Sequence, residues 1–396
     1  MIRFALIVAS TLGFVLTAAM GNLMVPLLRA FQSRQQPTRP PEPERPDAAP
    51  SQDSDEAPER PAQPPTMGGL CLMVGVLAAV GVGWTAACVA EPQLLGTEGL
   101  LSTRLLIALF GALLFGGVGL ADDLARIRRR APLGLRRGTR LLLEAGAGAV
   151  VLLLLGASRC LATGLALPGL GYVELGVLAP LVWEAGLVAL AESVCIADGI
   201  DGLCCGTAFA AQLGLMLCMT ILGWFPLAVF PAALAGALMA FLLWNFPPAR
   251  LRLGSVGSLF LAGALGCAPL CIGWPDLALP LGLPYWLEGG MVAVQIVVYQ
   301  TTHGKKQLFR TAPLHRWMEL RGSSAVQIFY TFVCSPCWAR RWPCNGQKSV
   351  EEVCRWQPSA EKSRSRSRCC SGTPAPGLPF CSTGWQRWAS SSYSGW

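Results

Sequence analysis

The stretch Ala197-Asp198-Gly199-Ile200-Asp201-Gly202-Leu203 places two carboxylates and two glycines between long apolar runs. The whole chain has 396 residues, of which 53% are hydrophobic and only 14% are charged. A carboxylate in or near hydrocarbon is costly, so acids at the edge of a membrane segment are candidates for function. Glycine lets the backbone approach a ligand closely. The stretch therefore predicts a functional loop at the edge of a membrane.

Apolar runs extend from this stretch in both directions. They predict an all-α, polytopic integral membrane protein with about ten transmembrane helices, because each run approaches the roughly 20 residues that cross a bilayer. Residues 1–30 are expected to form the first transmembrane helix, and residues 67–338 the membrane core. The runs are 4–28, 70–90, 105–120, 141–157, 175–196, 204–222, 225–243, 259–272, 277–299 and 325–338.

Two segments differ from this pattern in composition. Residues 31–66 are rich in proline, aspartate, glutamate and arginine. They cannot bury a core, and we expect a disordered cytoplasmic loop. Residues 339–396 are rich in cysteine, serine, arginine and tryptophan, without periodicity. We interpret them as an atypical tail, with an out-of-frame reading or a degenerate chain end as the hypothesis.

The distribution of arginine and lysine predicts the topology. Basic residues follow the first, third, seventh and ninth apolar runs, and the intervening short loops carry almost none. Basic loops stay in the cytoplasm, which places both termini outside and several polar motifs on the cytoplasmic face. The residues brought to this face are Asp122, Asp123, Asp198, Asp201, Ser255 and His315.

Two pairs of acids stand out among these residues. Asp122 and Asp123 end an apolar run beside an arginine-rich loop. They are either a solvated helix end balanced by arginines, or a pair that binds Mg²⁺ or takes a proton from a phosphate. Asp198 and Asp201 share one face if they are helical. A plain turn needs glycine but not two acids, so we favour a functional role for this pair.

Two later loops carry groups suited to phosphate. The loop from Asn245 to Ser258 is either an ordinary Pro/Gly connection or a glycine-rich cradle with Arg250 and Arg252 as counter-charges. A lone histidine is more often incidental than catalytic. His315, however, lies among several cations, which favours a role facing phosphate. Those cations are Lys305, Lys306, Arg310, Arg316 and Arg321.

Other polar residues allow different interpretations. Glu144, Glu184 and Glu192 lie within or near apolar runs, as packing residues or as the proton path of a transporter. Cys334 and Cys337 have CxxC spacing, which without a second pair is weak support for zinc.

Five motifs taken in order resemble a known family. They are Thr66-Met67-Gly68-Gly69, Asp122-Asp123, Asp198 to Gly202, Asn245 to Ser258, and Gly304 to Gly322. In these motifs residues 1–330 resemble the phospho-N-acetylmuramoyl-pentapeptide transferase family, of the polyprenyl-phosphate N-acetylhexosamine-1-phosphate transferase superfamily. The presence of five motifs in this order argues against the interpretation of the chain as a transporter.

The resemblance implies a reaction and its partners. UDP-N-acetylmuramoyl-pentapeptide would give its phospho-sugar to undecaprenyl phosphate, releasing UMP and forming lipid I in peptidoglycan synthesis. It also implies Mg²⁺ as cofactor and a multi-pass protein of the bacterial inner membrane, with its active site on the cytoplasmic face. The lipid bilayer and a homodimer are expected partners, and nucleic acid is not.

The family's site residues carry over to specific positions. The resemblance implies catalytic roles for Asp122, Asp123, Asp198 and His315. It implies substrate binding by Asp201, Asn245, Arg250, Arg252, Gly257, Lys305 and Arg310. Asp198 matches a metal ligand, whereas Cys195 and Ser255 replace the asparagine and aspartate usual at the family's other metal positions. A catalytically impaired member that binds nucleotide-sugar or lipid carrier, or a related N-acetylhexosamine-1-phosphate transferase, remains the alternative.

Overall fold

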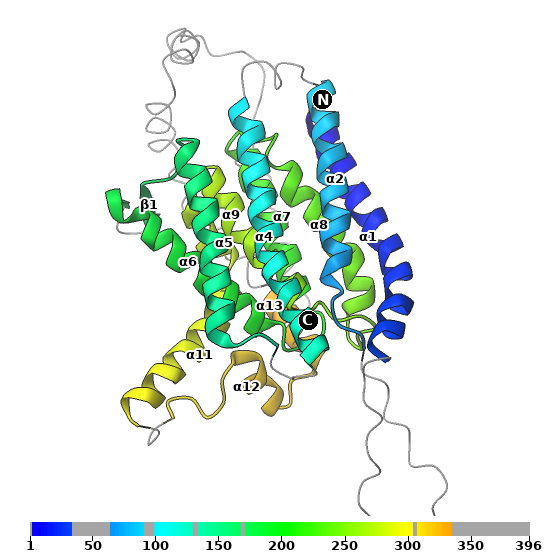
Figure 1. Cartoon of the computed structure of the whole chain (residues 1–396), viewed down its shortest axis with the longest axis vertical. Coiled ribbons are helices and arrows are strands. Elements are labelled where there is room, and N and C mark those ends of the chain that lie inside the picture. The colour runs from blue at the N-terminus through cyan, green and yellow to red at the C-terminus, as the bar shows by residue number, and fades with distance from the viewer. Residues whose placement is uncertain are drawn as a thin grey trace, which may run out of the picture. The chain divides into compact units, whose positions relative to one another are not determined.

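The computed structural model describes residues 2–33, 64–90, 99–129, 134–167, 171–303 and 307–334. Within these ranges the regular structure is almost entirely helical (Figure 1). The predicted class, an all-α protein with several membrane-length helices, is confirmed. The loop expected at 31–66 falls mostly outside the described residues. The tail at 339–396, Lys305, Lys306 and Cys337 also lie outside them.

The helices follow the predicted apolar runs. In chain order they are α1 Ile2–Ser33, α2 Gly69–Ala90, α4 Gly99–Arg129, α5 Arg137–Ala157, α6 Ala179–Ala197, α7 Leu203–Ile221, α8 Val229–Asn245, α9 Gly254–Cys271, α10 Ala278–Leu281, α11 Leu283–Thr301, α12 Leu314–Leu320 and α13 Ala325–Cys334. Short 3-10 helices, η1 Gly176–Leu178 and η2 Pro275–Leu277, precede α6 and α10. An antiparallel hairpin of β1 Gly164–Leu167 and β2 Gly171–Glu174, which the sequence did not predict, pairs Gly164 with Glu174.

The predicted count of about ten spanning helices is not confirmed. In the described part of the chain, seven helices are long and apolar enough to cross a membrane. An eighth is added if Pro275–Leu281 and Leu283–Thr301, which are bent by 81°, form one broken span. This pair corresponds to the predicted run 277–299. At 17 and 10 residues, α8 and α13 are shorter than the usual crossing length.

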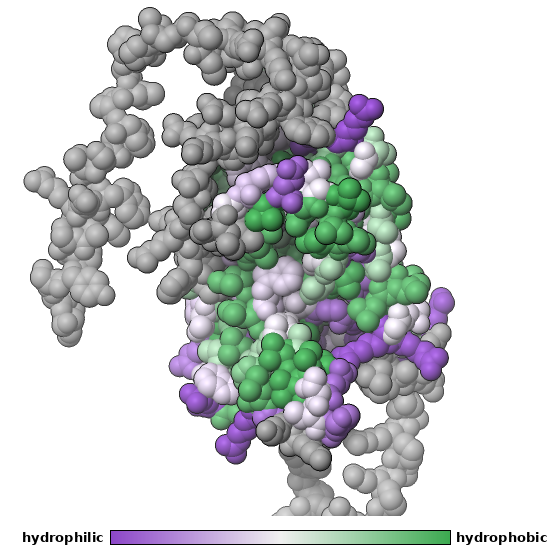
Figure 2. Space-filling view, turned by 90° about the vertical axis from the view of Figure 1, so that its left-hand side faces the viewer, coloured by the Kyte–Doolittle hydropathy of each residue, from purple (hydrophilic) through white to green (hydrophobic). Residues whose placement is uncertain are grey.

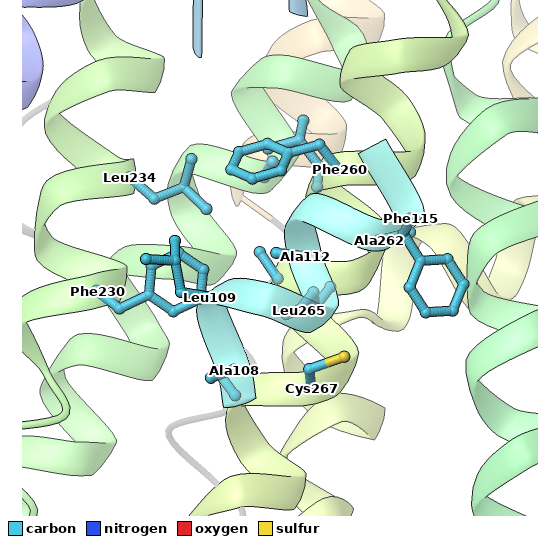
Figure 3. Close-up of a cluster of buried hydrophobic side chains, with 14 of the residues drawn as sticks. Ala108, Leu109, Ala112, Phe115, Phe230, Leu234, Phe260, Ala262, Leu265 and Cys267 are labelled. Carbon is cyan, nitrogen blue, oxygen red and sulfur yellow. The ribbon is translucent and has the colours of Figure 1, made fainter. Parts of the chain in front are cut away.

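Helix α9 forms the centre of the bundle, because all 18 of its residues are buried. Helix α4 packs along it through small side chains and aromatic rings, and α8 adds Phe230 and Leu234 to the same cluster (Figure 3). A Cβ atom at Gly263 of α9 would lie 2.9 Å from the Cα atom of Ala112 in α4. Small residues at such contacts let two backbones approach closely, which is how helices associate in lipid.

Several helices end or begin at the same end of the bundle. Helices α4 and α6 end there and α5 begins there, next to α12, whereas the β1–β2 hairpin lies at the opposite end (Figure 1). Gln32 near the end of α1 accepts a hydrogen bond from the backbone of Thr66, just before α2. At the same end, Gly69 at the start of α2 lies against Gly257 near the start of α9. This end therefore collects the loops that carry the polar motifs.

The outer surface of the bundle is apolar, as lipid contact requires. Leu142 and Leu153 on α5 are 73% and 72% exposed, and Leu181 on α6 is 67% exposed. On the side shown in Figure 2, hydrophobic residues cover much of the described surface, and many hydrophilic residues gather towards its lower edge. The exposed leucines thus fit a membrane environment rather than water.

We predict that the stability of the bundle depends on the close packing of α1 against α8. A Cβ atom at Gly236 would lie within 2 Å of the carbonyl oxygen of Ser10, so Gly236→Ala must push the helices apart. Overpacking of this kind costs about 1–3 kcal/mol. Thermal unfolding in detergent should show a lower midpoint for Gly236→Ala. Gly146→Ala is the matched control, because a Cβ atom on this exposed glycine of α5 meets nothing within 4 Å. Equal midpoints for the two variants would contradict the packing described.

Candidate active site

A polar cavity of about 210 Å³ lies at the motif-bearing end of the bundle. It is formed by the segment before α2 together with α4, α5, the α6–α7 connection, and the start of α9. Its lining combines three arginines, one carboxylate and several hydroxyl groups. The lining residues are Thr66, Arg126, Arg140, Cys195, Asp198, Arg252, Gly254, Ser255 and Ser258.

Asp122 is a buried carboxylate with partners on both oxygens. Its Oδ2 accepts hydrogen bonds from Ser255 Oγ at 2.8 Å and from Arg126 Nη2 at 3.1 Å. Its Oδ1 accepts one from the backbone N–H of Leu135 at 2.8 Å. Asp122 therefore ties α4 to α9 and to the segment before α5. The alternative of a solvated helix end is wrong, because Asp122 and Asp123 are each only 1% exposed.

Asp123 sits against the first turn of α9. Its Oδ2 accepts a hydrogen bond from the backbone N–H of Val256 at 3.0 Å. The N-terminus of a helix carries partial positive charge, which stabilises a nearby carboxylate. Gly254, with φ +76°, allows this approach, because a Cβ atom there would lie 2.7 Å from Asp123 Oδ2. The buried Oδ1 has no hydrogen-bond partner in the described structure and lies 3.6 Å from Arg126 Nη1.

Asp198 follows the last residue of α6 and faces the cavity. Burial raises the pKa of Asp198 to about 7. Arg252 opposes this rise, and the nearby carboxylates Asp123 and Asp201 add to it. A carboxyl group with a pKa near 7 can both accept and donate a proton at neutral pH. Asp198 is therefore suited to proton transfer.

Asp201 and Asn245 hold the neighbouring loops together. Asp201 Oδ2 accepts a hydrogen bond from the backbone N–H of Ala249 at 3.2 Å, and Arg252 Nε lies 4.0 Å from Asp201 Oδ1. The buried Asn245 accepts from the Gly202 N–H at 3.0 Å and donates to the Leu251 carbonyl at 2.9 Å. The side chains of Asn245 and Asp201 thus hold the Asp198–Gly202 turn against the loop that precedes α9.

His315 reaches the same turn from α12. Its Nδ1 lies 3.1 Å from Glu288 Oε2. Glu288 Oε2 also accepts a hydrogen bond from the backbone N–H of Leu314, and Glu288 Oε1 accepts one from that of His315, both at 3.0 Å. Because a carboxylate only accepts, Nδ1 carries the proton in this pair. Nε2 then points at Gly199, where a Cβ atom would lie 2.6 Å away. Glu288 therefore aims His315 at the turn that carries Asp198.

Arg140 is held by two glutamates at another wall of the cavity. Its Nε lies 3.1 Å from Glu144 Oε1 and donates to Glu192 Oε1 at 3.2 Å, and its Nη2 also donates to Glu192. Glu144 and Glu192 therefore serve to place a cation, rather than lining an independent proton path. Glu184 lies apart, against Gly148, and its two buried oxygens have no hydrogen-bond partner among the described residues.

The remaining predicted site residues lie in different surroundings. Gly257 is buried inside the helix contact, where a Cβ atom would lie 2.9 Å from the Cα atom of Gly69, and it does not line the cavity. Arg250 and Arg310 are exposed, and Lys305 lies outside the described residues. Substrate binding by Gly257, Arg250, Arg310 and Lys305 therefore stays a prediction.

The donors around the cavity do not fit the Mg²⁺ ion that the resemblance implies. No three His, Cys, Asp or Glu side chains are grouped to hold a metal within the described ranges. Ser255 offers a neutral hydroxyl that already bonds Asp122, and Cys195 offers a thiol whose Sγ lies 3.3 Å from Ser258 Oγ. Mg²⁺ prefers hard anionic oxygen, which neither residue supplies.

The part of the chain that carries this cavity matches known proteins. The family model described as Glycosyl transferase family 4 matches residues 105–273, which include Asp122, Asp123, Asp198, Asp201 and Ser255. The chain is also similar to several curated bacterial proteins named phospho-N-acetylmuramoyl-pentapeptide-transferase. Identity to the one from Latilactobacillus sakei is 30%, over 68% of this chain and 79% of the relative. It is 35% to that of Moorella thermoacetica, over 67% and 79%, and 31% to that of Desulforudis audaxviator, over 82% and 93%.

The fold, the site and these matches define a membrane-embedded glycosyl-1-phosphate transferase. The chain belongs to the phospho-N-acetylmuramoyl-pentapeptide-transferase family, and so to the enzymes of peptidoglycan synthesis.

Three residues of the site were not assigned from the sequence. Arg126 and Arg140 belong to a cluster of arginines, and nothing in that cluster shows which two face the cavity. Glu288 lies in an apolar run and was not singled out at all. Glu288 is too far from His315 in the sequence to suggest that the two residues are in contact. A lone acid in an apolar helix could nevertheless have marked Glu288 as a candidate functional residue.

We predict that Asp198 makes stability depend on pH. Its pKa is raised in the folded protein, so folding favours the protonated form, and stability falls as pH rises from about 4 to about 7. In metal-free detergent, the unfolding midpoint of the native protein should fall between about pH 5 and pH 8 by a few degrees more than that of Asp198→Asn. Parallel pH profiles for the two proteins would contradict the raised pKa of Asp198.

Proposed function

We propose that this protein transfers phospho-N-acetylmuramoyl-pentapeptide from its UDP derivative to undecaprenyl phosphate, giving lipid I and UMP. One observation carries the proposal. Asp198, which is suited to proton transfer, and three arginines from distant parts of the chain line one polar cavity, in a family named for this transfer. The membrane-length helices further support a lipid acceptor, because such an acceptor must reach the site from the bilayer.

The reaction is a displacement at the sugar-bearing phosphorus of the nucleotide diphosphate. An oxygen of the lipid phosphate forms a new P–O bond, and the P–O bond to UMP breaks, so the leaving UMP takes the electron pair. Any proton on the attacking phosphate must be accepted by the protein. Phosphoryl transfer depends chiefly on positioning and on neutralising charge, so cations and a fixed geometry are its main needs.

The side chains around the cavity supply these needs. Arg126, Arg140 and Arg252 line it and can neutralise the diphosphate. Asp198 is suited to take the proton of the lipid phosphate, because its pKa is raised to about 7. Asp123 offers a second acceptor, its buried Oδ1, which has no hydrogen-bond partner in the part of the chain that the structure describes. His315 faces the turn of Asp198 through Nε2 and can contact a phosphoryl oxygen.

The arrangement also supports a direction of approach. Basic residues follow the runs that end beside the cavity, and the positive-inside rule assigns them to the cytoplasm. We therefore place the cavity on the cytoplasmic face of the bacterial inner membrane. The nucleotide-sugar would enter from the cytosol and the prenyl chain from the bilayer.

The direct test is UMP release by the purified protein. With UDP-N-acetylmuramoyl-pentapeptide and undecaprenyl phosphate, the native protein should release UMP and form lipid I, and Asp198→Asn should release at least about tenfold less. UMP release that requires no lipid phosphate would contradict the proposal.

An impaired family member is the second candidate, favoured by the unusual side chains Cys195 and Ser255. It predicts binding of the nucleotide-sugar without UMP release, at any metal concentration. The same assay, combined with a binding measurement, separates the two.

We predict that Glu288 acts through His315. Glu288→Gln keeps the size of the side chain but weakens the hold on Nδ1, and misplacing a reacting group can cost about 100-fold in rate. The kcat for UMP release should fall in Glu288→Gln while the KM for the nucleotide-sugar changes little. Glu319→Gln is the control, because Glu319 is an exposed acid on the same short helix as His315. An equal effect of both substitutions on kcat would contradict this role.

A further inference from the structure

Arg126 makes three contacts that would otherwise suit a metal ion. Its Nη2 bonds Asp122 Oδ2 at 3.1 Å and Ser255 Oγ at 3.3 Å, and its Nη1 lies 3.6 Å from Asp123 Oδ1. Arg126 thus places one positive charge beside two buried carboxylates and donates a hydrogen bond to a hydroxyl group. Its side chain is 38% exposed and lines the cavity, so the charge also faces the place where a substrate would lie.

The hydrogen bonds of Asp122, a partner of Arg126, leave no oxygen of this carboxylate free for a metal ion. Asp122 has hydrogen bonds on both oxygens, from Ser255 and Arg126 on one and from Leu135 on the other. A divalent cation at Asp122 would have to displace the guanidinium, which cannot lose its proton in a protein. Ser255 cannot add an anionic oxygen to the set. Arg126 and the N-terminus of α9 therefore offset part of the charge of the two carboxylates without a metal.

We infer that Arg126 is a built-in cation that takes the place of a divalent metal ion at this site, so that the diphosphate of the substrate is bound without metal. The inference rests on the proposed function, since it assigns the diphosphate to this cavity. Arg140 and Arg252 stand on other walls of the cavity and complete the positive lining. A guanidinium binds phosphate oxygens through paired N–H groups and so can replace a metal as the neutralising group.

The experiment measures binding of UDP to the purified full chain by calorimetry, with EDTA and with millimolar Mg²⁺. The native protein should bind UDP with affinities that differ by less than about twofold between the two conditions. Arg126→Gln should bind UDP at least about tenfold more weakly in EDTA, because a charged hydrogen-bond donor is lost. Arg126→Lys should retain part of the affinity.

Two further variants make the measurement specific. Arg128→Gln removes an exposed arginine two residues away and should leave UDP binding unchanged. Ser255→Asp adds a carboxylate beside Asp122 and should make UDP binding depend on Mg²⁺, because a hard donor set is created. Thermal unfolding of each variant in detergent checks that it is folded.

The outcomes separate this inference from the proposed function. A native protein whose UDP affinity drops tenfold or more in EDTA overturns the inference, even if UMP release with Mg²⁺ upholds the function. Folded Arg126→Gln with native affinity in EDTA overturns it as well. Metal-independent UDP binding without UMP release supports the inference and defeats the function. A folded native protein that binds no UDP under either condition overturns both.

Discussion

The contact between the end of α4 and the start of α9 determines the rest of the site. Asp123 accepts a hydrogen bond from the backbone N–H of Val256. Asp122 accepts one from the hydroxyl group of Ser255, the residue before Val256. Helix α9 cannot shift to relieve these contacts, because all of its residues are buried and α4 packs along it. Two carboxylates are thereby held below 2% exposure at a helix N-terminus, where partial positive charge offsets part of their burial cost.

The other polar elements are arranged around this contact by pairing charges. Arg126 faces the acids of α4, Arg140 is held by Glu144 and Glu192, and Glu288 holds the backbone and ring of His315. Each pair places an opposite charge or a hydrogen-bond partner beside a group that would be expensive to bury alone in a membrane protein. These pairs fix where cations and proton acceptors face the cavity, which is the main requirement of phosphoryl transfer.

The sequence predicted the helical class and the meeting of distant motifs, but not the contacts that join them. Apolar runs mark helices by length and composition alone, so α1 to α11 lie near their expected positions. The count of about ten is not confirmed, because composition reveals neither the short lengths of α8 and α13 nor the 81° bend before Leu283. Asp122, Asp198 and His315 were recognisable from ordered motifs. Glu288 was not, because its role depends on tertiary contact with a residue 27 positions away.

We propose that a nucleotide diphosphate binds in the cavity between α4, the α6–α7 turn and the start of α9. An experimental structure of the full chain with bound UDP, in lipid nanodiscs, tests it most directly. We expect the two phosphates to lie among Arg126, Arg252 and Ser255, with Asp198 in contact range. UDP bound at another surface, or an Asp198 turn and His315 separated from the α4 acids, would contradict it.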